Sequence, residues 1–267
     1  MLKIVVSGAA GRMGRRVLAC ALQDTQVEVV GGVEHPAHAN VGMCIGELVG
    51  GSRSGARVVG DIDEVIEAAH VLIDFSQHEA AAAILDRAAA RGKSLVVGTT
   101  GFSDEERKRL AGLAGSVPVV WSSNFSAGVN LLFHLVERSA DILREEWDVE
   151  IVEQHHRYKA DAPSGTALRL AQIIADVQDL KLAEALRHGR SGELGPRGER
   201  EIGISAIRAG DCVGTHTVIF GGMSEQLEFT HRATNRDVFA RGALRAAKFV
   251  AGCRPGLYDM RDVLGLR

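Results

Sequence analysis

The first half of the chain alternates short apolar runs with helical patterns, and this alternation limits the folds that are open to it. Apolar runs occur at residues 2–7, 27–33, 71–75, 94–98 and 117–122, with helical patterns at 12–23, 77–91 and 103–114. Strands that alternate with helices form a parallel sheet whose two faces the helices cover. The sequence therefore predicts an α/β domain here.

Residues 34–57 break this alternation. The segment holds Gly42, Gly46, Gly50, Gly51 and Gly55 and no periodic apolar pattern. We expect a loop with little regular structure.

The pattern changes after Asn124. A long helix at 127–144, a strand with one wet face at 149–154 and a helical segment at 164–186 precede a polar, glycine-rich loop at 189–201. Three apolar runs follow at 202–208, 212–220 and 226–231, and a last helix at 235–250. Consecutive strands joined by short turns predict an antiparallel sheet. We infer two domains with a break near residues 124–127.

A glycine-rich turn follows the first apolar run. Gly8, Gly11 and Gly14 are spaced G-x-x-G-x-x-G and open the first helix. Such a turn lets the backbone approach a pyrophosphate at a helix N-terminus, although a tight turn that needs positive φ would also explain the glycines. Glu34 follows the next strand, near the ~20-residue offset of an acid that binds the adenosine ribose hydroxyls. Together these features predict a dinucleotide site.

Two further loops lie where a doubly wound sheet binds its ligand, at the carboxyl ends of strands. One is Gly98-Thr99-Thr100-Gly101, and the other runs from Ser122 to Ser126. Each alone could be an ordinary turn. Together they are predicted to line a nicotinamide pocket.

A cluster of cationic and titratable side chains precedes the helical segment that starts near Ser164. His155, His156, Arg157 and Lys159 lie within five positions. A solvated loop or a nucleic-acid patch would also explain them. The net charge of −3 and an aromatic content of 4% argue against a nucleic-acid partner.

Four motifs occur in a fixed order: GAAGRMG from Gly8, GTTG from Gly98, SNFS from Ser123 and HHRYKADAPSGTAL from His155. With these motifs the chain resembles, from end to end, the dihydrodipicolinate (4-hydroxy-tetrahydrodipicolinate) reductases of lysine synthesis. The resemblance implies a Rossmann-like, doubly wound parallel sheet with an inserted α+β domain that carries a mainly antiparallel sheet. It implies a dinucleotide-binding domain at 1–126 plus 240–267, and a substrate-binding and oligomerisation domain at 127–239.

The resemblance also implies a reaction. Members of the family reduce 4-hydroxy-tetrahydrodipicolinate with NADH or NADPH, with loss of water, in diaminopimelate and lysine biosynthesis, and they form homotetramers. His155 is then the proton donor and acceptor and Lys159 a proton donor. His156, Gly165 and Thr166 would bind the cyclic dicarboxylate, and a helix start at Gly165 suits an anion.

The residues that the resemblance assigns to the cofactor are Gly8, Ala9, Ala10, Gly11, Arg12, Met13, Glu34, His35, Gly98, Thr99, Thr100, Ser122, Ser123, Asn124 and Phe125. One position departs from some relatives, which place arginine directly after the acid where this chain has His35. Arginine is always charged and can bind a 2′-phosphate, whereas histidine is mostly neutral at pH 7. We therefore expect NADH to be used equally or in preference to NADPH, unless Arg53 or Arg57 reads the phosphate.

Two alternatives remain open at this point. One is another dehydrogenase of amino-acid metabolism that acts without a cyclic imine. The other is a nucleotide sensor without catalysis, against which the presence of both His155 and Lys159 argues.

Other features of the sequence concern metals and compartment. The four cysteines lie far apart, which predicts no metal site. No run of 18 apolar residues and no secretory signal occurs, so we expect no membrane span and a cytoplasmic protein with reduced thiols.

Overall fold

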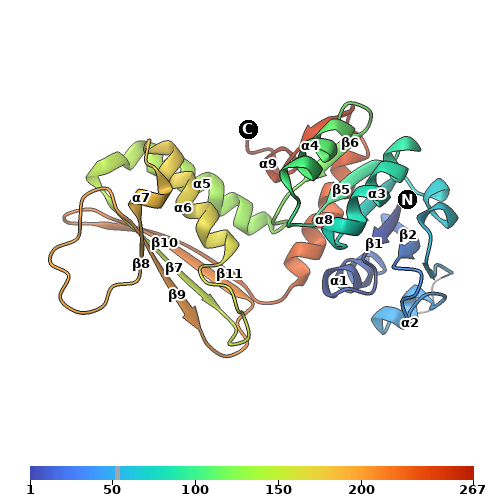
Figure 1. Ribbon diagram of the computed structural model, residues 1–267, viewed down its shortest axis with the longest axis horizontal. Coiled ribbons are helices and arrows are strands. Elements are labelled where there is room, and N and C mark those ends of the chain that lie inside the picture. The colour runs from blue at the N-terminus through green and yellow to red at the C-terminus, as the bar shows by residue number, and fades with distance from the viewer. Residues whose placement is uncertain (52–54) are drawn as a thin grey trace. The chain divides into compact units, whose positions relative to one another are not determined.

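The computed structural model describes residues 1–51 and 55–267. The chain divides into two compact units, one formed by residues 1–127 and 236–267 and the other by residues 128–235 (Figure 1).

The first unit is built on a seven-stranded sheet in which every pair of neighbours is parallel. The strand order is β12-β6-β5-β4-β1-β2-β3. The strands are β1 (Leu2–Ser7), β2 (Val27–Val33), β3 (Val58–Val59), β4 (Val71–Asp74), β5 (Ser94–Val97), β6 (Pro118–Trp121) and β12 (Gly256–Tyr258). The predicted doubly wound parallel sheet is confirmed. The short strands β3 and β12 have no apolar run that would reveal them.

Helices cover both faces of this sheet. They are α1 (Arg12–Ala21), α2 (Ile45–Val49), α3 (His78–Ala90), α4 (Asp104–Leu113), α8 (Asp237–Val250) and α9 (Met260–Leu264), with 3₁₀ turns at Ile62–Glu64 and Ile66–Ala68. Successive residues of β1 serve opposite faces: Ile4 and Val6 pack in a core with α1 and α8, and Val5 in a second core with α3 and α4. A strand that is buried on both faces has a continuous apolar run in its sequence, and β1 has such a run.

The expectation of an irregular loop over residues 34–57 is wrong in one part. Helix α2 lies within it, and a β-bridge joins Cys44 to Arg57. Ile45 and Leu48 are buried in the core beside α1 and hold this short helix in place. Gly50, with φ +68°, ends it. The two apolar positions, Ile45 and Leu48, lie among glycines, so the sequence showed no helical pattern there.

The second unit has a five-stranded sheet with three helices along one face (Figure 1). Its strands are β7 (Asp148–His155), β8 (Leu186–His188), β9 (Ile202–Arg208), β10 (Gly214–Gly221) and β11 (Gln226–Ala233). Its helices are α5 (Ala127–Leu143), α6 (Gly165–Val177) and α7 (Leu182–Ala185), with a 3₁₀ turn at Arg144–Glu146. The long helical pattern at 164–186 is interrupted at Asp179, whose φ is +52°.

The order of this sheet corrects the expected succession of antiparallel strands. The order is β11-β10-β7-β9-β8, with β10 antiparallel to both β11 and β7, and β9 parallel to both β7 and β8. The sheet is therefore mixed, because β7 lies between β9 and β10. The connection at 209–213 crosses the end of β7, where Ala209 N–H donates to His155 O and His156 N–H to Cys212 O. Its length suffices to cross two strand spacings of roughly 4.8 Å each.

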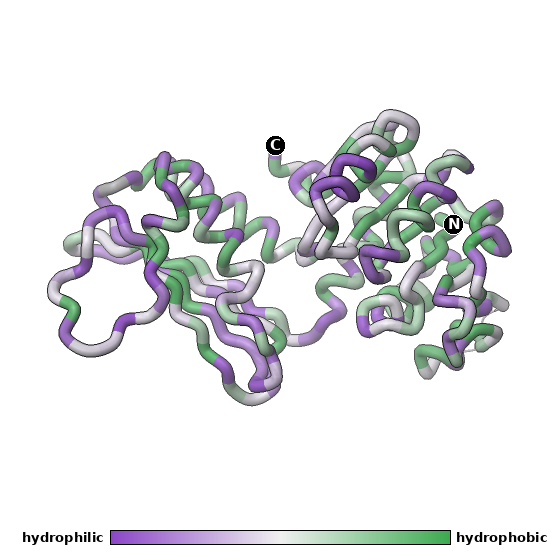
Figure 2. Tube along the Cα trace, in the orientation of Figure 1, coloured by the Kyte–Doolittle hydropathy of each residue, from purple (hydrophilic) through white to green (hydrophobic). Residues whose placement is uncertain are grey.

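The two faces of this sheet differ in what covers them. Val149, Ile151, Val218 and Phe220 are buried in a core with α5 and α6. Their neighbours along β7 and β10, among them Val152 and Ile219, alternate with them and point to the opposite face. The loop over residues 189–201 is irregular, as predicted, and mostly hydrophilic (Figure 2).

Among the residues described, no helix is both long enough and apolar enough to cross a membrane.

Candidate active site

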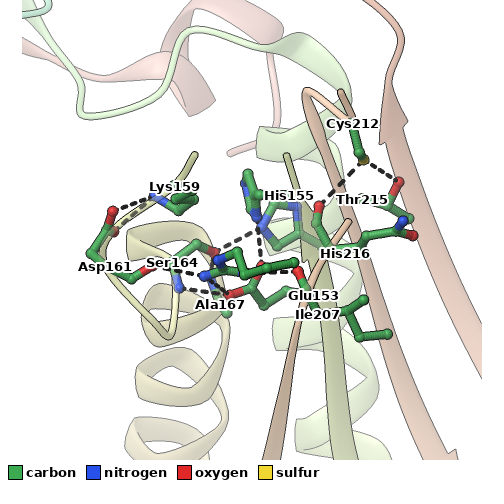
Figure 3. Close-up of polar contacts among 12 residues, drawn as sticks. Glu153, His155, Lys159, Asp161, Ser164, Ala167, Ile207, Cys212, Thr215 and His216 are labelled. Atoms are coloured by element: carbon green, nitrogen blue, oxygen red, sulfur yellow. Dashed lines mark hydrogen bonds and ion pairs between the residues drawn. The ribbon is translucent and has the colours of Figure 1, made fainter. Parts of the chain in front are cut away.

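The basic motif runs off the end of β7, through a loop and into α6 (Figure 3). β7 ends at His155, and Glu153 lies two residues before it on the same face of the strand. Ser164 caps α6, its Oγ accepting the N–H of Ala167 at 3.2 Å. The structure therefore brings the predicted residues of this motif to the end of one strand and the start of one helix.

Glu153 is the buried centre of this region, with no exposed side-chain surface. Its Oε1 accepts from Arg208 Nη2 at 2.8 Å and from Ser164 N–H at 3.1 Å. Its Oε2 accepts from Arg208 Nη1 at 3.0 Å and lies 2.5 Å from His155 Nδ1. Burial by itself raises the pKa of Glu153, but the hydrogen bonds from Arg208, His155 and Ser164 outweigh it and hold the pKa below its ordinary value. Glu153 is thus an ionised carboxylate in the interior.

His155 is a largely buried side chain, 12% exposed. Its ring meets that of His216 edge to face, with centroids 5.2 Å apart. Burial lowers the pKa of His155 below its ordinary value; Glu153 opposes that shift, and the charges of Lys159 and Arg208 reinforce it. The imidazole therefore loses its proton more readily than a free histidine does.

His216 connects β10 to the start of α6. Its Nε2 lies 3.0 Å from Ser164 Oγ. Burial, followed by the nearby His155, lowers the pKa of His216 to about 4. At pH 7 this imidazole is neutral and contributes no charge to the site.

Lys159 forms an ion pair within the loop. Its Nζ lies 2.8 Å from both carboxylate oxygens of Asp161. The Lys159 side chain is 20% exposed and that of Asp161 is 66% exposed. The hydrogen bond from Lys159 lowers the pKa of Asp161. Arg208 Nη2 also donates to Asp161 O at 2.7 Å, which ties the Lys159 loop to the Glu153 centre.

The three residues predicted to bind substrate lie at the start of α6 and just beyond the end of β7. His156 is the first residue beyond β7, and its N–H donates to Cys212 O at 2.7 Å. Gly165 is exposed, and a Cβ added to it would have no neighbour within 4 Å. Thr166 follows in the first turn of the helix. A helix N-terminus of this kind attracts an anion through its dipole and its amide groups.

In the first unit, the predicted glycine turn joins β1 to α1, with Gly11 exposed and Gly14 buried. Gly8 has φ +71°, and a Cβ there would lie 2.5 Å from Phe75 O. A Cβ on Gly14 would collide with the carbonyl of Gly8. Gly11 is the N-cap of α1 and provides no side-chain hydrogen bond. The helix start is consequently open to an anionic group.

Glu34 reaches this turn from the end of β2. Its Oε1 accepts the N–H of Ala10 at 2.7 Å, and Oε2 has no hydrogen bond within the described part of the chain. His35 is exposed, and its Nδ1 accepts the N–H of Ala37 at 3.2 Å. Of the alternative cations, Arg57 donates to Gly42 O at 2.8 Å, while Arg53 lies outside the described residues.

The other predicted loops border two neighbouring hollows. One, of about 610 Å³, is lined by Arg12, Met13, residues 75–79 and residues 98–100. The second, of about 290 Å³, is lined by residues 99–102, Arg107 and residues 121–123. Both include Thr99 and Thr100. The loops after β1, β5 and β6 therefore converge at the carboxyl edge of the parallel sheet.

The loop after β6 is held by its own side chains. Ser122 Oγ donates to Asn124 O at 2.8 Å, and Asn124 Oδ1 accepts the N–H of Ser126 at 2.9 Å. The ring of Phe125 is buried and packs against Phe75 with centroids 5.7 Å apart. The side chain of Phe125 thus belongs to the core.

Several residues of these sites were not predicted from the sequence. Glu153 could have been predicted from the sequence, because residues two apart on a strand lie on the same face and Glu153 comes two residues before His155. Arg208 and His216 come from strands far along the chain, and no local pattern connects them to His155. In the first unit, the buried carboxylate of Asp74 accepts hydrogen bonds from Thr99 Oγ1 at 2.5 Å and Ser76 Oγ at 2.7 Å. Burial raises the pKa of Asp74.

Comparison with known proteins extends over the whole chain. Two family models match, described as the N-terminus of dihydrodipicolinate reductase at residues 2–125 and its C-terminus at residues 128–264. A 4-hydroxy-tetrahydrodipicolinate reductase of Syntrophus aciditrophicus (strain SB) is 46% identical over 100% of both chains. One of Anaeromyxobacter sp. (strain Fw109-5) is 48% identical over 100% of this chain and 99% of the relative.

A solved structure has the same fold. It is a dipicolinate-bound dihydrodipicolinate reductase from Paenisporosarcina sp. TG-14, which is 23% identical, covers 97% of each chain and has a TM-score of 0.78.

Proposed function

The chain belongs to the dihydrodipicolinate reductase family, and from that premise we propose how its residues carry out the reaction. It is an NAD(P)H-dependent oxidoreductase that reduces 4-hydroxy-tetrahydrodipicolinate to tetrahydrodipicolinate in diaminopimelate and lysine biosynthesis. The net reaction takes up one hydride and one proton and releases one water. The observation that carries the residue assignments is the His155–Glu153 pair beside Lys159, next to the start of α6.

The substrate is a cyclic dicarboxylate, and its charges require cations and N–H donors. In this proposal one carboxylate binds at the first turn of α6, to the amides of Gly165 and Thr166, and His156 contacts it from the end of β7. The exposed Gly165 has no side chain to obstruct that approach. The dipole of α6 adds a favourable interaction with the anion.

His155 and Lys159 exchange protons with the substrate. The ammonium of Lys159 is held by a largely exposed carboxylate, and such ion pairs are weak, so the amine can turn from Asp161 to the substrate. His155 has a lowered pKa, which makes its cation a stronger acid than free imidazolium. The two groups supply the proton that balances the hydride.

The residues around the glycine turn fit a nicotinamide dinucleotide. The N-terminus of α1, whose N-cap is Gly11, and the turn at Gly8 with its positive φ suit a pyrophosphate, and Oε2 of Glu34 remains for the ribose hydroxyls. The loops at 98–100 and 122–125 would flank the nicotinamide, with the Phe125 side chain acting as support. When bound, the cofactor supplies the hydride. Glu34 followed by His35 favours NADH as an equal or preferred donor, because a 2′-phosphate would meet a carboxylate without an adjacent permanent cation.

The two units divide this work. We assign dinucleotide binding to the unit that contains the glycine turn, and substrate binding and oligomerisation to the unit that contains His155. The face of the five-stranded sheet that carries no helix within residues 128–235, with Val152 and Ile219, supports a homotetramer built through that face. A cytoplasmic location completes the proposal, in keeping with the absence of a disulfide among the four cysteines, all of which are described.

The experiment that tests this function is NADH oxidation with freshly prepared 4-hydroxy-tetrahydrodipicolinate. We expect turnover with this substrate and none with aspartate semialdehyde or homoserine. Turnover of either rival substrate in place of the cyclic one would assign the chain to a different dehydrogenase. Cofactor binding without any turnover would support a nucleotide sensor.

A further inference from the structure

A fully buried carboxylate supports the imidazole of His155. Glu153 uses both oxygens: it accepts one hydrogen bond from Ser164 N–H and one from His155 Nδ1 (Figure 3). It accepts two more from Arg208. These donors come from β9, from the cap of α6 and from β7. A carboxylate is costly to bury unless its partners compensate for the lost water. Glu153 thus joins three elements at one histidine.

We propose that Glu153 is a positioning residue for the reduction, fixing the tautomer of His155 so that Nε2 alone exchanges the proton with the substrate. The inference rests on the proposed role of His155 and extends it to a residue that does not touch the substrate.

The tautomer follows from the chemistry of the pair. An ionised carboxylate only accepts hydrogen bonds, so His155 Nδ1 carries a hydrogen in both the neutral and the cationic imidazole. In the cation, Nε2–H donates its proton to the substrate; in the neutral form, Nε2 accepts a proton from water and restores the acid. Glu153 gains no proton in either step.

The surroundings of Nε2 are consistent with this role. No residue in the described part of the chain forms a hydrogen bond with that nitrogen, while Nδ1 is engaged at 2.5 Å. Gly214 lies beside it, and a Cβ at that position would be 3.0 Å from Nε2. The absence of a side chain at Gly214 leaves room next to the reacting nitrogen.

The groups around His155 act on its charge in opposite directions. Glu153 on β7 stabilises the cation, whereas burial, Lys159 in the loop and Arg208 on β9 disfavour it. His216 on β10 packs against the ring and is neutral at pH 7. Removing the charge of Glu153 therefore deletes a contribution that stabilises the cation, and we expect the pKa of His155 to fall.

Glu153→Gln tests the inference, because the amide keeps the shape but can present an N–H to Nδ1 and so favour the Nε2–H tautomer. We expect kcat to fall by about 10²-fold or more, the scale of lost acid–base help, with the Kd for NADH unchanged. ¹⁵N NMR of His155 should show Nδ1–H in the wild type, a shift towards Nε2–H in the variant, and a lower pKa. Glu153→Asp, which retains the charge, should restore part of the activity.

Glu150→Gln is the matched control. Glu150 lies on the same strand but on the opposite face, where it pairs with Arg190 and Arg197. The control removes the same charge and should leave the His155 tautomer and kcat unaltered.

Three outcomes would overturn the inference: an Nε2–H tautomer in the wild type, an unchanged tautomer and pKa in folded Glu153→Gln, or wild-type kcat in that variant. The wild-type NMR measurement keeps the test decisive even if the variant does not fold. Loss of turnover in His155→Gln together with full turnover in Glu153→Gln would reject the positioning role alone. A wild type without turnover would instead reject the proposed function.

Discussion

Among single residues, two positions allow ligand binding to be tested separately from stability. Gly165 lies at the first position of α6, with open space where a side chain would be. His35 is exposed directly after the acid that approaches the glycine turn. Neither residue contributes a buried side chain, so changes in either should alter ligand affinity more than stability.

Gly165→Ala should weaken substrate binding without destabilising the protein. The added methyl group contacts no protein atom but enters the space in which the substrate carboxylate would meet the helix amides. We expect KM for the substrate to rise roughly tenfold or more, the cost of a misplaced methyl group, while Tm is unchanged or higher because alanine favours a helix over glycine. Gly112→Ala in α4, where a Cβ also meets nothing within 4 Å, is the control and should leave KM alone. An unaffected KM in Gly165→Ala would contradict the assignment.

His35→Arg should raise kcat/KM for NADPH by roughly tenfold, the scale of one charge-assisted hydrogen bond. The permanent charge would offset the repulsion between Glu34 and a 2′-phosphate. The measurement is kcat/KM for NADH and NADPH at pH 6 and pH 8, with His38→Arg as the control for charge alone. A wild type that strongly prefers NADPH at pH 8 would show that another cation reads the phosphate.

Among the secondary-structure elements, the periodicity of apolar residues predicted the strands whose bounds depend on local burial. β1 and β2 were predicted with their observed bounds, because strands buried on both faces leave continuous apolar runs. The order of the mixed sheet was not predictable, since the placement of β7 between β9 and β10 depends on hydrogen bonds between distant segments. The same limit applies to the site: the motif identified His155, but its carboxylate centre also needs Arg208 from β9.

The hydrogen bond between His216 on β10 and Ser164 at the start of α6 makes the second unit sensitive to acid. His216 has a folded pKa of about 4, below the ~6.5 of an unfolded histidine. The unfolded chain therefore binds more protons between these values, and stability is present above pH 6.5 and lost as pH falls towards 4. This one group contributes about 3 kcal/mol over that window.

His216→Gln should reduce that loss. Glutamine can keep a hydrogen bond to Ser164 Oγ but does not titrate. We expect urea unfolding of the variant to depend less on pH between 6.5 and 4 than that of the wild type. The exposed His188→Gln, in the same unit, is the control and should keep the wild-type dependence. Equal pH dependence in all three proteins would show that His216 does not control the acid response.

At the scale of the whole molecule, the sheet of the second unit has a face without helices. Ile219 lies on this face, in register with Glu150 on β7 and Glu228 on β11. Apolar side chains on a sheet face gain stability when a second copy of the chain removes them from water. This face is therefore where the proposed homotetramer is most easily tested.

Ile219→Lys should dissociate the tetramer into smaller species. The new ammonium can pair with the two flanking carboxylates, so the protomer should remain folded, but a charge buried between subunits is strongly unfavourable. Sedimentation velocity measures the outcome, and circular dichroism verifies the fold. Ile219→Val is the control and should preserve the assembly. A tetramer that persists in Ile219→Lys would exclude this face as the interface.

In the proposed reaction, the cluster around His155 protonates a cyclic dicarboxylate, and the other unit holds the reductant. The most direct measurement is the rate of NADH oxidation with saturating 4-hydroxy-tetrahydrodipicolinate in the wild type, His155→Gln and Lys159→Ala, alongside the Kd for NADH. We expect each substitution to lower kcat by about 10²–10⁴-fold, while the Kd for NADH stays within error of the wild type. Near-normal turnover in both variants would contradict it.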